Sequence, residues 1–282
     1  PRTDRHSNAP QPTRRMMRLF PAACLLAGSF LPVSAAAQCR LALALALDVS
    51  GSVDATEYAL QQQALAAALM RPEVQDMFFA LPQAPVRLMA YEWSGPSHQR
   101  ILAPWREIST QNDLLNFTGE LTDKLRRPAP PSTALGTAMA FGLAALAQQT
   151  DCQATTLDIS GDGKANTGPL PQNIKPLALA QNTTVNALVI GADNPASGDI
   201  RYFEIGELIS YFKANVISGS GAFAEAALGF SDYEEAMTRK LLRELSPGFF
   251  SKNQVPTSPK EKGAPSSARP ARIALPLIPG SA

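Results

Sequence analysis

The stretch that decides the fold is RLALALALDVSGS, residues 40–52. Between Arg40 and Asp48 it is entirely apolar and shows no polar alternation, which predicts a central parallel strand covered on both faces. Asp48 opens a polar turn. A helix is expected from about Asp54, because Asp54 and Glu57 have the spacing of a capping box. The folded part of the chain is therefore expected to begin with a buried strand, a polar turn and a helix.

Strands and helices are expected to alternate along the rest of the chain. Further strands are predicted at 86–94, 99–105, 154–160, 184–190 and 214–218. The first two suit an antiparallel hairpin through Gly95 and Pro96. Helices are predicted at 111–126, at 134–149, and from a capping box of Ser231 and Glu234 to Leu245. This order predicts a three-layer, doubly wound α/β fold. It would have a mostly parallel six-stranded sheet, one antiparallel edge strand and helices on both faces.

Three polar segments adjoin these elements: D-V-S-G-S at 48–52, S-T-A-L-G at 132–136 and S-G-D-G at 160–163. In an open α/β sheet, ligands bind outside the carboxyl ends of the strands, where the strand order reverses. If the strands ending at Asp48 and Asp162 flank that point, the oxygens of the three segments converge. Two carboxylates and the hydroxyls of Ser50, Ser52 and Thr133, without sulfur or imidazole, suit Mg²⁺, Mn²⁺ or Ca²⁺ rather than zinc.

The D-V-S-G-S stretch, the S-T-A-L-G turn and the G-D-G turn resemble the metal-ion-dependent adhesion site of von Willebrand factor A domains. The resemblance covers roughly residues 40–247. Within that superfamily, Y-E-W-S-G (91–95), D-I-S-G-D-G (158–163) and G-A-F (221–223) resemble a bacterial exported group called DUF1194. The resemblance implies that Ser50, Ser52 and Thr133 bind a divalent cation, with Asp48 and Asp162 close by and acting partly through water. It also implies an open coordination position that accepts an acidic side chain from a partner protein.

One residue departs from the superfamily pattern, in which the third segment usually reads T-D-G. Gly161 takes the place of the threonine, which removes a hydroxyl close to the metal position. The segments also allow a simpler interpretation, in which Ser52 or Asp54 only caps the following helix.

Three other side chains near this edge carry expectations. Asp158 shares a strand face with Asp162 but lies two pleats below it, so we expect a buried, paired carboxylate there. Glu92 and Trp93 end the second strand at the same edge and are candidates for contact with a partner. A tryptophan packed against a loop is the alternative for Trp93.

Both ends of the chain differ from its middle. Residues 13–37, TRRMMRLFPAACLLAGSFLPVSAAA, have the three parts of a secretory signal peptide. We therefore expect a leader over 1–37, with the signal peptide at about 14–37, cleavage before Gln38, and a periplasmic or secreted product. A start at Met16 or Met17 would leave residues 1–15 untranslated. The apolar run is too short and too broken by proline to act as a membrane anchor. A folded domain is expected over 38–250, and a disordered tail over the Pro-, Ser- and Lys-rich residues 251–282.

Charge and histidine content limit the function. Residues 38–250 contain 15 basic and 22 acidic residues, a net charge of −7. Such a domain is a poor electrostatic match for nucleic acid. His98 is the single histidine left after the leader, which excludes a multi-histidine zinc site and argues against a Ser-His-Asp triad.

The two cysteines of the expected mature chain, Cys39 and Cys152, are predicted to form a disulfide. An oxidising compartment favours pairing. Cys39 lies nine residues before Asp48, and Cys152 ten before Asp162. If both acids end adjacent parallel strands, both cysteines lie at the opposite edge, where strands are ~4.8 Å apart, close to the Cα separation of a disulfide. Two unpaired thiols are the alternative.

Together these features predict an exported binding module and not an enzyme, because no nucleophile–base pair is evident. The module would hold Mg²⁺, or Mn²⁺ or Ca²⁺, and bind a protein partner through a carboxylate. The alternatives are a Mg²⁺-dependent hydrolase with Asp48 or Asp162 as base, and a scaffold whose site has lost its metal.

Overall fold

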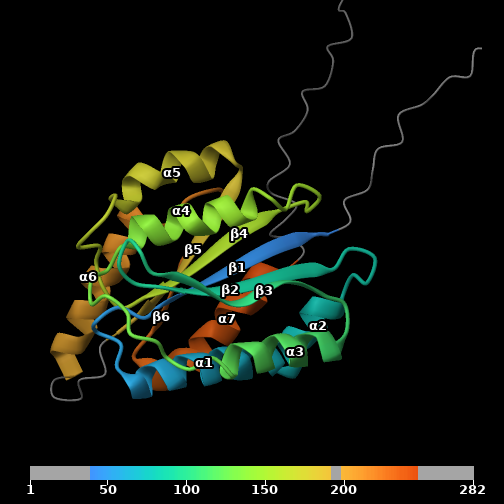
Figure 1. Cartoon of the computed structure of the whole chain (residues 1–282), viewed down its shortest axis with the longest axis horizontal. Helices are drawn as coiled ribbons and strands as arrows, with labels where there is room; N and C mark the ends of the chain where they lie inside the picture. The colour runs from blue at the N-terminus through green and yellow to red at the C-terminus, as the bar shows by residue number, and fades with distance from the viewer. Residues whose placement is uncertain (1–38, 192–197, 247–282) are drawn as a thin grey trace, which may run out of the picture. The chain divides into compact units, whose positions relative to one another are not determined.

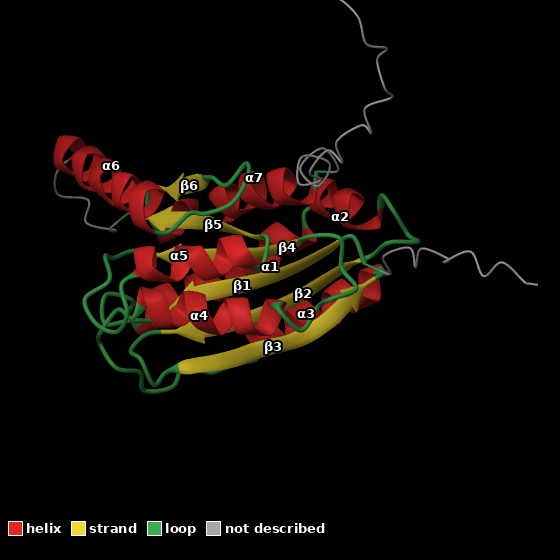
Figure 2. Ribbon diagram, turned by 90° about the horizontal axis from the view of Figure 1, so that it is seen from above, coloured by secondary structure: helices red, strands yellow, loops and turns green. Residues whose placement is uncertain are grey.

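The structure, a computed structural model, describes residues 39–191 and 198–246. A six-stranded sheet has the order β3-β2-β1-β4-β5-β6 (Figure 2). The strands are β1 (Leu41–Asp48), β2 (Val86–Trp93), β3 (Gln99–Ile108), β4 (Thr155–Gly161), β5 (Thr183–Ile190) and β6 (Ala224–Ala227). Neighbouring strands are parallel except for β2 and the edge strand β3, which are antiparallel. The predicted fold class is confirmed. The expected leader, its cleavage site and the tail lie outside the described residues.

Helices cover both faces of the sheet (Figure 1). One face carries α1 (Ala55–Met70), α2 (Pro72–Phe79), α3 (Gln111–Thr122) and α7 (Tyr233–Leu245). The other carries α4 (Leu135–Leu146), α5 (Pro171–Ala180) and α6 (Gly198–Asn215). None of the helices among the described residues is long and apolar enough to span a membrane.

The alternation of leucine and alanine in β1 gives the two faces of the sheet different side chains. Its leucines, Leu41 to Leu47, pack in the core beneath α1, α2, α3 and α7. Its alanines, Ala42 to Ala46, pack in the second core beneath α4. Small side chains let α4 approach closely. A Cβ at Gly142 of α4 would come within 2.6 Å of both Leu157 Cδ1 and Tyr91 Oη.

The capping box that was expected at the start of α1 is present. The Asp54 carboxylate accepts hydrogen bonds from the backbone of Thr56 and Glu57, at 2.7 and 2.9 Å. The Glu57 carboxylate accepts one from the Asp54 N–H at 2.7 Å. This cap fixes where the polar turn after β1 ends and the helix begins.

One predicted strand and one predicted helix cap are wrong, although the last helix runs to Leu245 as predicted. Residues 214–218 do not form the last strand: α6 ends at Asn215, and Ser218 makes an isolated bridge with Val185, while the last strand is β6. The Ser231–Glu234 capping box is also absent. A 3₁₀ turn, Phe230–Asp232, precedes α7, and Asp232 accepts a hydrogen bond from the N–H of Leu228 instead.

Candidate metal centre

The first polar segment lies where the strand order reverses. β1 pairs with β2 on one side and with β4 on the other, so Asp48 and Asp162 end up at the carboxyl edge of two adjacent parallel strands. The backbone of the turn is held tightly. The N–H of Ser50 donates to Asp48 Oδ1 at 2.8 Å, and that of Gly51 donates to the carbonyl of Pro131 at 3.0 Å. The topology therefore creates the binding position expected for this fold class.

The second segment reaches the first through the loop before α4. The Thr133 hydroxyl donates to Ser50 Oγ at 3.4 Å. Its backbone is fixed by Asn166, whose side-chain oxygen accepts from the Thr133 N–H at 2.8 Å, while the Asn166 N–H donates to the Thr133 carbonyl at 3.0 Å. Sequence reasoning missed Asn166, which carries no signal that distinguishes it from any other loop asparagine.

The third segment closes the cluster. The hydroxyl of Ser52 donates to Asp162 Oδ1 at 2.7 Å and lies 3.5 Å from the hydroxyl of Ser50. Asp48, Ser50, Ser52, Thr133 and Asp162 are thus brought together from three separate parts of the chain. The helix-cap interpretation of Ser52 is not what the structure shows, since Asp54 caps α1 and Ser52 faces Asp162.

The cluster is less exposed than a solvated rim. Asp48, Ser50 and Thr133 have exposed fractions of 0, 1 and 6 %. Ser52 is exposed and Asp162 is half-buried. The oxygens of the site are therefore mostly buried, and we call these five side chains the metal pit.

Burial disfavours negative charge on the two carboxyl groups of the pit while no cation is bound. Burial, and then the nearby charge of Asp162, raise the pKa of the Asp48 carboxyl to about 8. Burial also raises the pKa of Asp162. Asp48 Oδ2 has no hydrogen-bond partner among the described residues. A buried oxygen without a partner is costly unless a cation or water satisfies it, so the residues present fit a hard divalent ion. The described residues hold no cluster of three or more His, Cys, Asp or Glu side chains, so hydroxyls would have to share in any coordination here.

The structure explains the glycine that departs from the superfamily pattern. A Cβ at Gly161 would lie 3.2 Å from Phe212 Cζ, 3.4 Å from Asp48 Oδ2 and 3.6 Å from Trp93 Cζ2. The contact with Phe212 of α6 is tight, and those with Asp48 and Trp93 are ordinary van der Waals distances. The position of the usual threonine therefore lies next to aromatic rings from α6 and β2.

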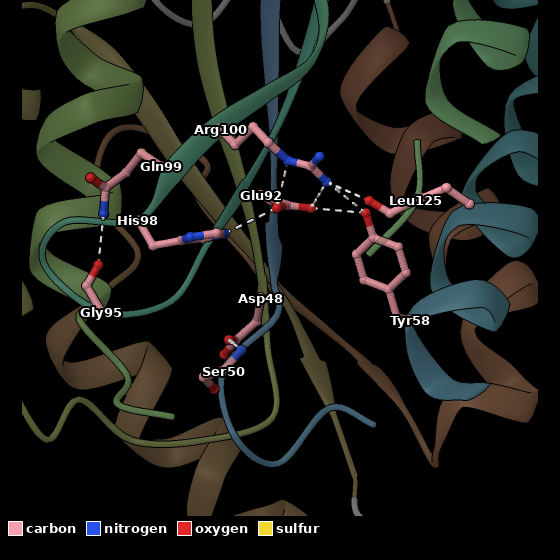
Figure 3. Close-up of polar contacts among 9 residues, drawn as sticks. All are labelled: Asp48, Ser50, Tyr58, Glu92, Gly95, His98, Gln99, Arg100 and Leu125. Carbon is pink, nitrogen blue, oxygen red and sulfur yellow. Dashed lines mark hydrogen bonds and ion pairs between the residues drawn. The ribbon is translucent and has the colours of Figure 1, made fainter. Parts of the chain in front are cut away.

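Glu92 and Trp93 are not partner contacts, which corrects the expectation. Their exposed fractions are 1 and 0 %. Glu92 accepts two hydrogen bonds from Arg100, at 2.7 and 2.8 Å, and one from the hydroxyl of Tyr58 at 2.9 Å. His98 Nε2 lies 3.0 Å from the same carboxylate (Figure 3). The hairpin pairs Glu92 with Arg100 across the strands, a signal that was present in the sequence. Trp93 is buried within the core beneath α4, α5 and α6, and not packed against a loop as the alternative had it.

Asp158 is buried and paired, as predicted. Its carboxylate lies 2.7 Å from the Nζ of Lys240, which also contacts Glu244. Asn186 donates to Glu244 at 2.7 Å. This group holds α7 against β4 and β5, away from the metal pit.

The predicted disulfide between Cys39 and Cys152 is present, with the two Cα atoms 4.4 Å apart. The cysteines also form an isolated parallel bridge, just before β1 and β4 begin. They lie at the end of these strands opposite to Asp48 and Asp162.

Comparisons with known proteins agree with this architecture. Two crystal structures of proximal thread matrix protein 1 from the mussel byssus are similar, with TM-scores of 0.52 and 0.50 at 12 and 16 % identity. Each match covers 74 % of this chain and 47 or 48 % of that chain. A von Willebrand factor type A protein from Catenulispora acidiphila has a TM-score of 0.49 at 12 % identity, over 73 % of this chain and 43 % of that one.

The chain thus spans about half the length of the solved structures that it matches, and such low identity concerns the fold alone. No curated protein matches it. The family described as "Protein of unknown function (DUF1194)" matches residues 38–248, most of the chain. The chain therefore belongs to the DUF1194 family, and its α/β fold is similar to that of proximal thread matrix protein 1.

Proposed function

We propose that this domain is a binding module that holds a divalent cation, Mg²⁺ or Mn²⁺, and uses it to bind a carboxylate of a partner protein. The observation that carries the proposal is the pit itself. Five oxygen-bearing side chains from three segments meet there, and one buried carboxylate oxygen, Asp48 Oδ2, has no partner among the described residues.

The ligand chemistry favours binding of an anion. Ser50, Ser52 and Thr133 would act as neutral ligands, and the two carboxylates would lie close by. A hard divalent cation held largely by neutral oxygens keeps much of its charge and attracts a carboxylate, which displaces only water. We propose binding and not catalysis, because the sequence offers no evident nucleophile–base pair. The disulfide is consistent with an exported protein, and we propose a periplasmic or secreted location.

Calorimetric titration of the purified protein with Mg²⁺ and Mn²⁺ tests the first half of this proposal. We expect saturable binding of one ion by the native protein and by Asp76→Asn, which removes an exposed carboxylate far from the pit in sequence. Asp48→Asn and Thr133→Ala should abolish it. Circular dichroism should show a retained fold in both, and equal binding by Asp48→Asn and the native protein would contradict the site.

The second half is tested by capture from envelope extract with native and Asp48→Asn bait. A specific partner should be retained in Mg²⁺, released by EDTA and lost with the variant. Retention that survives both EDTA and Asp48→Asn would show that the pit is not the contact.

A further inference from the structure

The loop between α3 and α4 carries a cluster of cations that have no acidic partner. Lys124, Arg126 and Arg127 make no ion pair with any residue that the structure describes. Elsewhere Arg71, Arg87, Arg106 and Arg239 are each paired with carboxylates. With Asp123 at its start, the segment 123–127 has a net charge of +2 in a domain of net −7. The net charge of this segment is therefore opposite in sign to that of the whole domain.

Two anchors hold this basic segment at the carboxyl edge of the sheet. Arg100, itself clamped by Glu92, donates from Nη2 to the carbonyl of Leu125 at 3.1 Å (Figure 3). Further along, the carbonyl of Pro131 accepts from Gly51 at 3.0 Å. A loop fixed at Leu125 and at Pro131 loses less conformational freedom on binding than a free one, which favours recognition.

A hollow lies beside the segment, between α1 and α3. Its volume is about 250 Å³, and its lining includes Tyr58, Gln62, Thr122, Lys124 and Arg126. Leu125, with 84 % of its surface exposed, also lines it. Two cationic side chains, polar groups and one exposed apolar side chain therefore surround one concave surface.

The hollow and the metal pit share an edge of the domain. The hollow includes Ala55, in the first turn of α1, three residues after Ser52. The basic loop continues through Pro131 directly to Thr133. One extended ligand at this edge can contact both sites.

We propose that the hollow and the segment Lys124–Arg127 bind an acidic segment of the protein partner whose carboxylate reaches the metal pit. This rests on the proposed function for its second contact, while the basic segment forms a site in its own right. Charge complementarity selects an acidic ligand, and the exposed Leu125 favours a polypeptide over a sugar–phosphate chain.

The test uses the full chain and a fluorescent oligoglutamate peptide, followed by fluorescence anisotropy at low salt, in Mg²⁺ and in EDTA. Arg126→Gln/Arg127→Gln should weaken binding roughly three- to tenfold in both buffers, since exposed charge pairs contribute little individually. The affinity of this variant for the peptide should also depend less steeply on salt concentration than that of the native protein. The matched control, Lys175→Gln/Lys213→Gln, changes net charge equally but on α5 and α6, and should bind as the native protein does.

The outcomes separate the two proposals. If Asp48→Asn and EDTA weaken binding while Arg126→Gln/Arg127→Gln does not, the metal site stands and the basic site falls. If the arginine variant weakens binding but Mg²⁺ adds nothing, the basic site stands and the metal-dependent contact falls. If the arginine variant and the lysine control lose equal affinity for the peptide, the effect comes from net charge alone, and the proposal of a basic site is wrong. A single-stranded oligonucleotide is the last comparison. If it binds more tightly than the peptide and loses this binding in the arginine variant, the result contradicts the proposal that the ligand is a protein.

Discussion

At the scale of single residues, the buried group around Lys240 makes stability depend on pH. Burial raises the pKa of Asp158 to about 7, although the charge of Lys240 opposes the shift. Between about pH 4 and 7 the folded protein therefore holds a proton that the unfolded chain releases. The free energy of unfolding should fall as pH rises through this window.

Asp158→Asn keeps the shape of the side chain and removes this titration. We expect the variant to lose less stability than the native protein between pH 5 and pH 8, measured as urea midpoints at both values. Asp48 contributes a slope of the same sign, so the difference between the two proteins is the informative quantity. An identical pH dependence in both would show that Asp158 is ionised throughout.

The predicted convergence of polar side chains is confirmed where the sequence places them close together or at strand ends, as it does for Asp48, Ser50 and Ser52. The pairing of Asp158 was expected, but its partner Lys240 was not, because a lysine in an amphipathic helix is usually solvated. Glu92 and Trp93 were read as exposed because a strand end suggests a rim. Both residues are buried, and Arg100, on the neighbouring strand of the hairpin, covers the Glu92 carboxylate.

At the scale of elements, the close approach of α4 to the sheet depends on glycine. Gly142→Ala would place a Cβ 2.6 Å from Leu157 Cδ1 and Tyr91 Oη, so we expect a loss of about 1–3 kcal/mol from overpacking. Gly119→Ala, within α3, is the matched control. Its Cβ would meet nothing within 4 Å, so better helix propensity should stabilise the protein by about 0.5–1 kcal/mol. Denaturant midpoints of the two variants should move in opposite directions.

Element predictions held where apolar periodicity was strong and failed at the last edge of the sheet. Residues 214–218 contain β-branched side chains, which suggested a strand, but Val216 is buried at the end of α6 and its N–H donates to Phe212. The true edge strand, β6, is four residues of alanine and glutamate. Because alanine and glutamate have low β-strand propensity, β6 forms through its pairing with β5.

At the scale of the whole molecule, the disulfide joins segments 113 residues apart in sequence. Replacing both cysteines, Cys39→Ala/Cys152→Ala, should lower the free energy of unfolding by about 2–5 kcal/mol, because the unfolded chain gains conformational freedom. Thermal unfolding of the native protein with and without reductant gives a second measurement. Unchanged midpoints in both experiments would contradict a stabilising role.

The two central strands are thus fastened at one end by a covalent bond, while the proposed ion-binding pit lies at the other. A load applied at the Asp48–Asp162 edge runs along the axis of β1 and β4. The backbone hydrogen bonds between β1 and β4 lie across that direction. They would therefore bear such a load in shear, all at once, and would not open one after another. The disulfide at the far end prevents the strands from sliding past each other.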